Sequence, residues 1–218
     1  MSDRYPTGIV KPASNIRELL AWPVAHVSID VQNAYCSPRG RVASMGYDMS
    51  WADPVATTIA EFTAQSRELL DSTVFVRTEH PEWRSPALSR QFDRTTLGSF
   101  AAWDGLYDWY GDVRPGPQDE VITKTRYSAF VGTTLAAHLR AKRVETIIVT
   151  GVTTDVCVDS SVRDAFFQDF SVIVLADGTG GSTPERHENA LEILDLYFAT
   201  VSDSQSVLAE LRAKRGGA

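Results

Sequence analysis

The chain has 218 residues, of which 43% are hydrophobic and 22% are charged, and its formal net charge is −7. This length suits one α/β domain, and the composition is that of a folded protein rather than a disordered one. The negative charge argues against a nucleic-acid partner, because binding phosphates requires clustered Lys and Arg.

No apolar stretch is long enough for a membrane span, and the N-terminal residues lack the apolar core of a secretion signal. The two cysteines, Cys36 and Cys157, form no Cys-x-x-Cys pattern, so we expect free thiols instead of a disulfide. Together these features predict a cytoplasmic protein with no membrane partner.

Apolar runs rich in β-branched residues recur along the chain, and segments with helical spacing separate them. The runs predict strands at Val24–Val31, Thr73–Thr78, Glu120–Thr123, Thr146–Val152, Ser171–Ala176 and Ala199–Ser202. Their continuous hydrophobicity is typical of parallel strands that are buried on both faces. The helical spacing predicts helices at Asp53–Leu70, Ser128–Lys142, Thr154–Asp169, Pro184–Phe198 and Ser204–Lys214.

This alternation predicts one α/β domain over residues 1–218, with a three-layer, doubly wound, mostly parallel six-stranded sheet and helices on both faces. Residues 1–20 are expected to be an N-terminal extension. Residues 79–118 are rich in Pro, Gly, Trp and Asp and show little periodicity. Loops of this length usually have a function, so we expect a lid or wall of a pocket, or an oligomer interface. Its aromatic residues favour a homo-oligomer.

Three polar residues fall at or just after the ends of predicted strands. Asp30 ends the first run, Lys124 follows the third, and Cys157 comes shortly after the fourth. In open parallel sheets, ligands bind beyond the carboxyl ends of the strands. We therefore expect these three side chains to meet in one site.

Cys157 lies in the first turn of a predicted helix, after a glycine that follows the strand. A thiol at this place feels the positive end of the helix dipole, which favours the thiolate. Backbone N–H groups of the first turn lack partners within the helix and can form an oxyanion hole. A buried structural cysteine is the alternative, because free cysteines commonly pack as small hydrophobic residues.

Asp30 ends an otherwise apolar run, and a carboxylate is seldom buried without a partner. Lys124 is the natural partner, and its ammonium group would also help to keep the thiol ionised. Such an acid could accept the thiol proton and later deliver it to a leaving amine. A plain buried salt bridge is the alternative reading of the pair.

Three segments resemble the signatures of the isochorismatase-like cysteine hydrolases: DVQNAY at 30–35, TKTRYSAF at 123–130 and GVTTDVCVDSSVRDAFFQDF at 151–170. The resemblance runs from about residue 24 into the C-terminal region. It is strongest to the ureidoacrylate amidohydrolase and N-carbamoylsarcosine amidase branch. It implies a Rossmann-like sheet, and family members often form dimers or tetramers.

The same resemblance places a catalytic triad at Asp30, Lys124 and Cys157. It also implies a cis peptide bond between Val152 and Thr153. The backbone N–H groups of Thr153 and Cys157 would then form the oxyanion hole.

Candidate substrate contacts are Gln32, Asn33, Tyr127 and Trp83. The two amides suit a ureido or carboxylate group, and Tyr127 resembles a pocket tyrosine of the ureidoacrylate branch. Trp83 lies where the pocket wall is expected. For each of them, plain packing or the anchoring of a loop is the open alternative.

Nicotinamidases of this superfamily bind a metal through an Asp-x-His pair and a further histidine. This chain has four histidines, and none stands in such a pair, so we expect no metal. The segment Gly178–Gly181 lacks the spacing of a dinucleotide-binding loop, so we expect no cofactor there, only a turn before the next helix.

These observations predict a cysteine-dependent amidohydrolase, that is, a hydrolase of carbon–nitrogen bonds in linear amides other than peptides. The substrate would be a small amide, ureido or N-carbamoyl compound, and the intermediate a thioester. One alternative is a vinyl-ether hydrolase of the isochorismatase type, in which the aspartate protonates the substrate and no cysteine is needed. The other is a catalytically silent binding protein.

Overall fold

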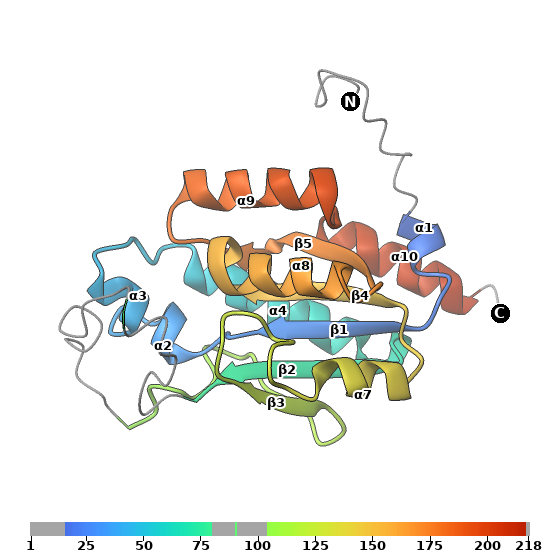
Figure 1. The fold of residues 1–218 in the computed structure, drawn as a ribbon, viewed down its shortest axis with the longest axis horizontal. Helices are drawn as coiled ribbons and strands as arrows, with labels where there is room; N and C mark the ends of the chain where they lie inside the picture. Colours follow the sequence, from blue (N-terminus) through green and yellow to red (C-terminus); the bar gives the residue numbers. More distant parts are fainter. Residues whose placement is uncertain (1–15, 80–89, 91–103, 217–218) are drawn as a thin grey trace.

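The computed structural model describes residues 16–79, 90 and 104–216, and Figure 1 shows a central sheet between layers of helices. The strands are β1 Val24–Ile29, β2 Ser72–Thr78, β3 Glu120–Lys124, β4 Thr146–Val152, β5 Ser171–Gly180 and β6 Thr200–Ser202. Their order is β3-β2-β1-β4-β5-β6, and every pairing is parallel. The predicted doubly wound α/β sheet is confirmed.

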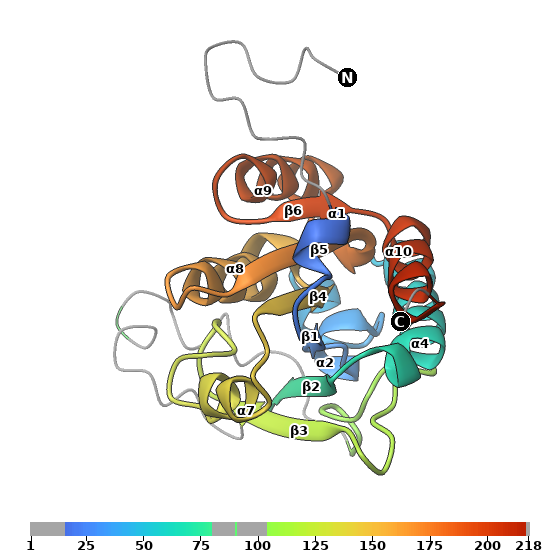
Figure 2. The same cartoon turned by 90° about the vertical axis from the view of Figure 1, so that its right-hand side faces the viewer.

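Helices cover both faces of this sheet, as the end-on view in Figure 2 shows. One layer holds α7 Leu135–Ala141, α8 Asp159–Phe166 and α9 Pro184–Tyr197, and the other holds α4 Ala52–Ser66 and α10 Ser204–Gly216. Shorter elements are α1 Ile16–Leu19, α2 Asn33–Cys36, α3 Arg41–Ser44 and the 3-10 turn η1 Arg67–Leu69. In the described part of the chain, no helix is long and apolar enough to cross a membrane.

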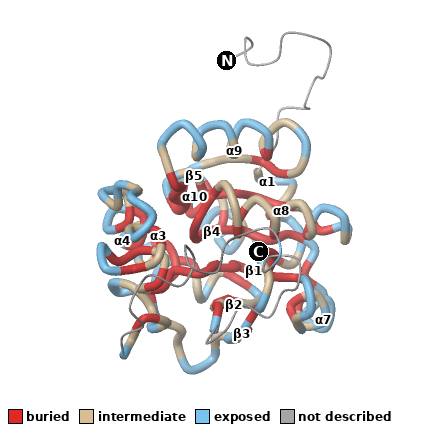
Figure 3. Tube along the Cα trace, turned by 60° about the vertical axis from the view of Figure 1, so that its left-hand side comes forward, coloured by how far each residue is buried: buried red, intermediate tan, exposed pale blue. Residues whose placement is uncertain are grey.

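The two faces of β4 explain why its sequence is continuously apolar. Ile147 and Val149 pack into one hydrophobic cluster with residues of α7 and α8, whereas Ile148 packs into a second cluster with residues of α4 and α10. Figure 3 shows the strands as the buried interior and the helices as the partly exposed shell. Because both faces are covered, the ends of the strands are where polar side chains can meet a ligand from solvent.

The predicted helix Ser128–Lys142 was too long, since α7 begins only at Leu135. Before α7, side chains form hydrogen bonds with nearby backbone groups. The Ser128 hydroxyl accepts from the Phe130 N–H at 3.1 Å, and the Thr133 hydroxyl donates to the Ala129 carbonyl at 2.6 Å. Such local bonds compete with a helix. Residues 125–134 therefore form a loop at the carboxyl end of β3.

The predicted turn at Gly178–Gly181 was also wrong, because β5 continues to Gly180. A Cβ atom on Gly180 would lie 2.2 Å from the ring of Trp51, so only glycine allows this strand end to pack there.

The predicted N-terminal extension includes α1, and residues 1–15 lie outside the described residues. Of the predicted loop 79–118, only residues 79, 90 and 104–118 are described. Within it, the Trp109 ring meets Phe75 edge to face at 5.5 Å, and the Tyr110 hydroxyl donates to Asp53 at 2.6 Å. These aromatic residues pack against the chain itself, and the oligomeric state stays a prediction.

Candidate active site

The three candidate residues leave the sheet at one edge. The chain builds β2 and β3 on one side of β1 and then crosses to β4 on the other side, so the switch point lies between β1 and β4. Asp30 follows β1, Lys124 ends β3, and Cys157 lies in the turn after β4. Ligands of such sheets bind at this point.

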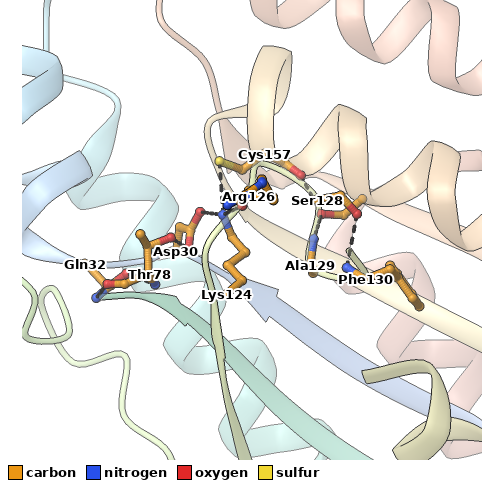
Figure 4. Close-up of polar contacts among 10 residues, drawn as sticks. Asp30, Gln32, Thr78, Lys124, Arg126, Ser128, Ala129, Phe130 and Cys157 are labelled. Atoms are coloured by element: carbon orange, nitrogen blue, oxygen red, sulfur yellow. Dashed lines mark hydrogen bonds and ion pairs between the residues drawn. The ribbon is translucent and has the colours of Figure 1, made fainter. Parts of the chain in front are cut away.

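The side chains meet as the sequence predicted, and Figure 4 shows Lys124 between the other two. Its Nζ lies 2.7 Å from Oδ2 of Asp30 and 3.5 Å from Sγ of Cys157. Nζ also donates to the Arg126 carbonyl at 2.8 Å, which ties the loop after β3 to the site. Asp30 is fully buried and Lys124 is 2% exposed, so the ion pair is shielded from water.

Thr78 completes the surroundings of the Asp30 carboxylate. It ends β2, in register with Lys124, and its hydroxyl donates to Oδ1 of Asp30 at 2.9 Å. Burial raises the pKa of the nearby Tyr35 well above its usual value, and the charge of Asp30 adds to the effect. One carboxylate oxygen of Asp30 is thus held by the Thr78 hydroxyl and the other by Lys124.

Asp30 itself has an uncommon backbone conformation. Its φ of 55° lies in the left-handed region, which Asn and Asp tolerate better than most residues. Its N–H donates to the Val76 carbonyl of β2 at 2.8 Å. Such outliers persist where the surroundings hold them, often at functional sites.

Cys157 lies in a single π-helical turn, η2 Thr154–Val158, which precedes α8. A helix therefore lies where Thr154–Asp169 was predicted, but its first turn is π-helical rather than α-helical. The Thr153 carbonyl accepts from the N–H groups of Val156 and Val158, and Ser161 donates to the Cys157 carbonyl at 2.6 Å. The Ser161 hydroxyl also accepts from the Ala129 N–H at 2.9 Å, which connects η2 to the loop after β3.

The strand before this turn approaches β1 very closely. Gly151 pairs with Ile29, and a Cβ atom on Gly151 would lie 2.1 Å from the Ile29 carbonyl oxygen. Its φ of 120° also favours glycine. The peptide bond between Val152 and Thr153 is cis, as the family resemblance predicted.

The ionisation of the thiol differs from the prediction. Burial raises the pKa of Cys157 to about 12, although Lys124 acts in the opposite direction. Burial also opposes the charge of Lys124, but the interactions of Lys124, above all with the Asp30 carboxylate, outweigh burial and leave its pKa raised. Hence Cys157 is a thiol in the ligand-free protein, and Lys124 does not by itself keep it ionised. A base must remove the proton when the substrate is attacked.

The structure supports the anchoring alternative for Gln32 and Asn33. The Gln32 amide nitrogen donates to the carbonyls of Thr78 at 3.1 Å and Tyr107 at 2.6 Å, and its oxygen accepts from the Thr78 N–H at 2.8 Å. The Asn33 side chain donates to the Gly105 carbonyl at 2.8 Å. These amides hold residues 105–109 against α2 and β2, and their role as substrate contacts stays a prediction.

Tyr127, by contrast, lies near the reacting groups. Burial raises its pKa, and the positive charges of Arg41 and Lys124 act in the opposite direction. Its side chain is 40% exposed, so a ligand can reach it. Trp83 lies outside the described residues.

Cys36 is a second buried free thiol, and burial raises its pKa. In the described part of the chain, no group of three or more His, Cys, Asp or Glu side chains could hold a metal ion. The expectation that this protein uses neither metal nor cofactor stays a prediction.

Sequence reasoning missed Thr78 and Ser161. Thr78 could have been found, because it ends a predicted strand at the edge where the triad was expected. Ser161 lies in the motif around Cys157, but no spacing rule shows that its hydroxyl binds the Cys157 carbonyl and the Ala129 N–H.

Comparison with known proteins identifies the family of the chain. The isochorismatase domain model matches residues 24–206. The ureidoacrylate amidohydrolase RutB of Variovorax paradoxus is 36% identical over 198 residues, which cover 82% of this chain and 77% of that protein. RutB of Methylobacterium radiotolerans is 34% identical over 195 residues, covering 81% of this chain and 75% of that protein.

Solved structures share the fold. A cysteine hydrolase from Pseudomonas syringae has a TM-score of 0.77 at 19% identity and covers 96% of this chain and 100% of its own. The nicotinamidase PncA of Bacillus subtilis has a TM-score of 0.69 at 25% identity and covers 83% of this chain and 99% of its own. The domain match and these relatives show that the chain belongs to the isochorismatase family.

Proposed function

We propose that the chain is a cysteine-dependent amidohydrolase that cleaves a carbon–nitrogen bond of a small amide, ureido or N-carbamoyl compound through a thioester on Cys157. Its family and its similarity to ureidoacrylate amidohydrolases make it a hydrolase of carbon–nitrogen bonds other than peptide bonds. The observation that carries the finer proposal is the contact of one buried lysine with both a carboxylate and a thiol.

Asp30 acts first, as the general base. The Cys157 thiol is protonated in the ligand-free protein, since burial raises its pKa to about 12. Asp30 takes this proton while the sulfur attacks the substrate carbonyl, so the thiolate forms only as its charge passes to the substrate. Lys124 stabilises the negative charge on either side of this transfer, because its Nζ lies between the two groups.

The attack forms a C–S bond and a tetrahedral oxyanion. The backbone N–H groups of Thr153 and Cys157 would stabilise this oxygen, as the family resemblance implies. The C–N bond then breaks, and Asp30 returns its proton to the leaving nitrogen, which departs as ammonia or an amine. The product on Cys157 is a thioester or, from a ureido group, a thiocarbamate.

Water completes the cycle. Asp30, again a carboxylate, takes a proton from water while the oxygen attacks the acyl carbon. The C–S bond breaks, the sulfur regains a proton, and the acid is released. A carbamic acid formed from a ureido group then loses carbon dioxide.

The vinyl-ether hydrolase is the other candidate, because the same aspartate could protonate a substrate without a nucleophile. The placement of Cys157 against Lys124 favours the covalent route. The third candidate is a catalytically silent binding protein. It is disfavoured because it gives no chemical role to the buried ion pair of Asp30 and Lys124.

A substrate screen with acid quenching tests the proposal. The purified chain is incubated with ureidoacrylate, N-carbamoylglycine, N-carbamoyl-β-alanine, biuret, nicotinamide and maleamate, and the release of ammonia is measured. The quenched protein is digested, and the Cys157 peptide is weighed by mass spectrometry. We expect ammonia from at least one substrate and an acyl group on Cys157.

Turnover without any adduct, and with full activity in Cys157→Ala, would overturn the covalent mechanism. Turnover of isochorismate with none of the amides would favour the vinyl-ether hydrolase. The absence of turnover with every compound would favour the binding protein.

A further inference from the structure

Thr78, the last residue of β2, connects the general base to the sheet. Its hydroxyl donates to Oδ1 of Asp30 at 2.9 Å, and both side chains are buried. Lys124 Nζ lies 2.7 Å from the other oxygen, Oδ2. The two oxygens of one carboxylate therefore have different partners, a neutral hydroxyl and an ammonium group.

The backbone of Thr78 is held by the side chain of Gln32. β1 pairs with β2 as far as Ile29 and Val76, and at Asp30, whose φ is 55°, the chain leaves the sheet. The Gln32 amide takes over there: its oxygen accepts from the Thr78 N–H at 2.8 Å, and its nitrogen donates to the Thr78 carbonyl at 3.1 Å. These bonds satisfy backbone groups that a neighbouring strand would otherwise pair, so the end of β2 stays fixed.

Gln32 also connects Thr78 with a third segment of the chain. Its amide nitrogen donates to the Tyr107 carbonyl at 2.6 Å, and its backbone pairs with that of Trp109 in an antiparallel bridge. Gln32 is fully buried, so water does not compete for these bonds. Figure 4 shows a row of side chains that runs from Gln32 through Thr78 and Asp30 to Lys124.

Lys124 alone does not fix the plane of the carboxylate. Rotation about the last side-chain bond of an aspartate is weakly restricted and exchanges its two oxygens. A lysine ammonium acts as a point charge on a flexible stem, so it attracts either oxygen. Thr78 has a stiff, β-branched side chain, and its hydroxyl holds Oδ1. Oδ2 is then kept toward the ammonium group, which also contacts Sγ of Cys157 at 3.5 Å.

The hydrogen bond from Thr78 suits both protonation states of the base. Before the transfer, the hydroxyl donates to a carboxylate oxygen. Once the proton has moved from Sγ of Cys157 to Oδ2, Oδ1 is the carbonyl oxygen of a carboxylic acid and still accepts. A proton on Oδ1 would instead occupy the oxygen that already accepts from Thr78.

We propose that Thr78, held by Gln32, is a positioning residue that fixes Asp30 so that Oδ2 takes the proton of Cys157. This inference rests on the proposed function and deepens it. Thr78 acts through Asp30, so removal of its hydroxyl should slow the proton transfer without weakening the binding of the substrate.

Replacement of Thr78 tests the assignment, with the screened compound that the wild type turns over fastest. Thr78→Val keeps the shape of the side chain and removes the hydroxyl. It should lower kcat for ammonia release by roughly 10- to 100-fold, because the base is misaligned, while KM changes by less than about threefold. The rate at which the acyl group appears on Cys157 in a single turnover should fall as well. Thr78→Ser keeps the hydroxyl and should bring kcat to within about threefold of the wild type.

Two further variants serve as comparisons, and all are assayed well below their unfolding midpoints. Thr73→Val removes a buried hydroxyl near the opposite end of β2 and should keep the kcat of the wild type. Gln32→Met removes the clamp on Thr78 and should also lower kcat. In the double variant with Thr78→Val it should add little, because both act through one contact. The Thr78 variants decide the assignment even if Gln32→Met does not fold.

A kcat of Thr78→Val close to that of the wild type, an equal loss in Thr73→Val, or no recovery in Thr78→Ser would overturn the inference. A change in KM alone would also overturn it, because Thr78 would then act on binding. If the wild type forms an acyl group on Cys157 and Thr78→Val does so equally fast, the inference fails alone. If the wild type turns over no compound, or Cys157→Ala is fully active, the proposed mechanism fails and the inference falls with it.

Discussion

Cys36 and Cys157 are both buried thiols that feel the charge of Asp30, but only Cys157 has a lysine beside it. Both are almost fully shielded, at 1% and 8% exposed, and burial raises the pKa of each. Around Cys36, the charges of Asp30 and Asp53 raise the pKa further. Around Cys157, Asp30 acts in the same direction, but Lys124 opposes it.

This difference shows what distinguishes a nucleophile from a packed cysteine in this fold. Neither thiol is ionised at neutral pH, so the resting charge does not separate them. What separates them is access to a base and to a compensating cation during the reaction. Both thiols pack in hydrophobic clusters, but Cys157 also contacts Nζ of Lys124, which in turn contacts Asp30, whereas Cys36 packs against Val55 and Ile59 of α4.

Replacement of each thiol by alanine gives the largest expected contrast. Cys157→Ala should lower kcat by about 10⁴-fold or more, because covalent chemistry is lost. Cys36→Ala should keep full activity and lose roughly 1–2 kcal/mol of unfolding free energy through lost packing. Ammonia release and denaturant unfolding measure the two effects. Loss of activity in Cys36→Ala without unfolding would break the contrast.

Removal of the compensating cation should have the next largest effect. Lys124→Met leaves the buried Asp30 carboxylate unpaired, so it should destabilise the fold by about 3–5 kcal/mol. It should also lower kcat by about 10²–10³-fold, because the charge on sulfur and carboxylate is no longer stabilised. Lys142→Met, an exposed lysine at the end of α7, serves as the control.

The double variant Asp30→Asn with Lys124→Met separates the two effects. It removes the uncompensated charge, so much of the stability should return while activity stays lost. An active Lys124→Met enzyme would contradict the role of the lysine. Activity measured at a temperature well below the unfolding midpoint excludes simple unfolding as the cause.

The smallest predicted effect is the pH dependence of thiol alkylation. The thiolate is the reactive form. With the pKa of Cys157 at about 12, the iodoacetamide rate in the ligand-free protein should rise about tenfold per pH unit, without a plateau between roughly pH 7 and 9. Lys124→Met should slow Cys157 and spare Cys36, because only Cys157 loses its cation. A plateau near neutral pH would show a thiolate that is ionised at rest.

Resistance to alkylation at neutral pH is thus the expected behaviour of this enzyme, not evidence for a silent binding protein. The position of Cys157 after a strand, at the start of a helix, predicts a thiolate. Burial of the sulfur outweighs this effect and raises the pKa of Cys157, and burial depends on the side chains that pack over the sulfur.

The six parallel strands, their helical connections and the meeting of Asp30, Lys124 and Cys157 could all be predicted from the sequence. This is possible because continuous apolar runs can be buried only between two helical layers, and parallel strands bring their carboxyl ends to one edge. The sequence also predicted, through its family motifs, the cis bond between Val152 and Thr153.

The start of α7, the end of β5, the π turn that carries Cys157 and the partners of Gln32 could be recognised only in the folded chain. The start of α7 depends on local side-chain hydrogen bonds, whereas the end of β5 and the partners of Gln32 depend on contacts between segments far apart in the chain. The raised pKa of Cys157 also depends on the fold. A pKa depends on burial and on the distance to charges, and neither quantity exists until the chain is folded.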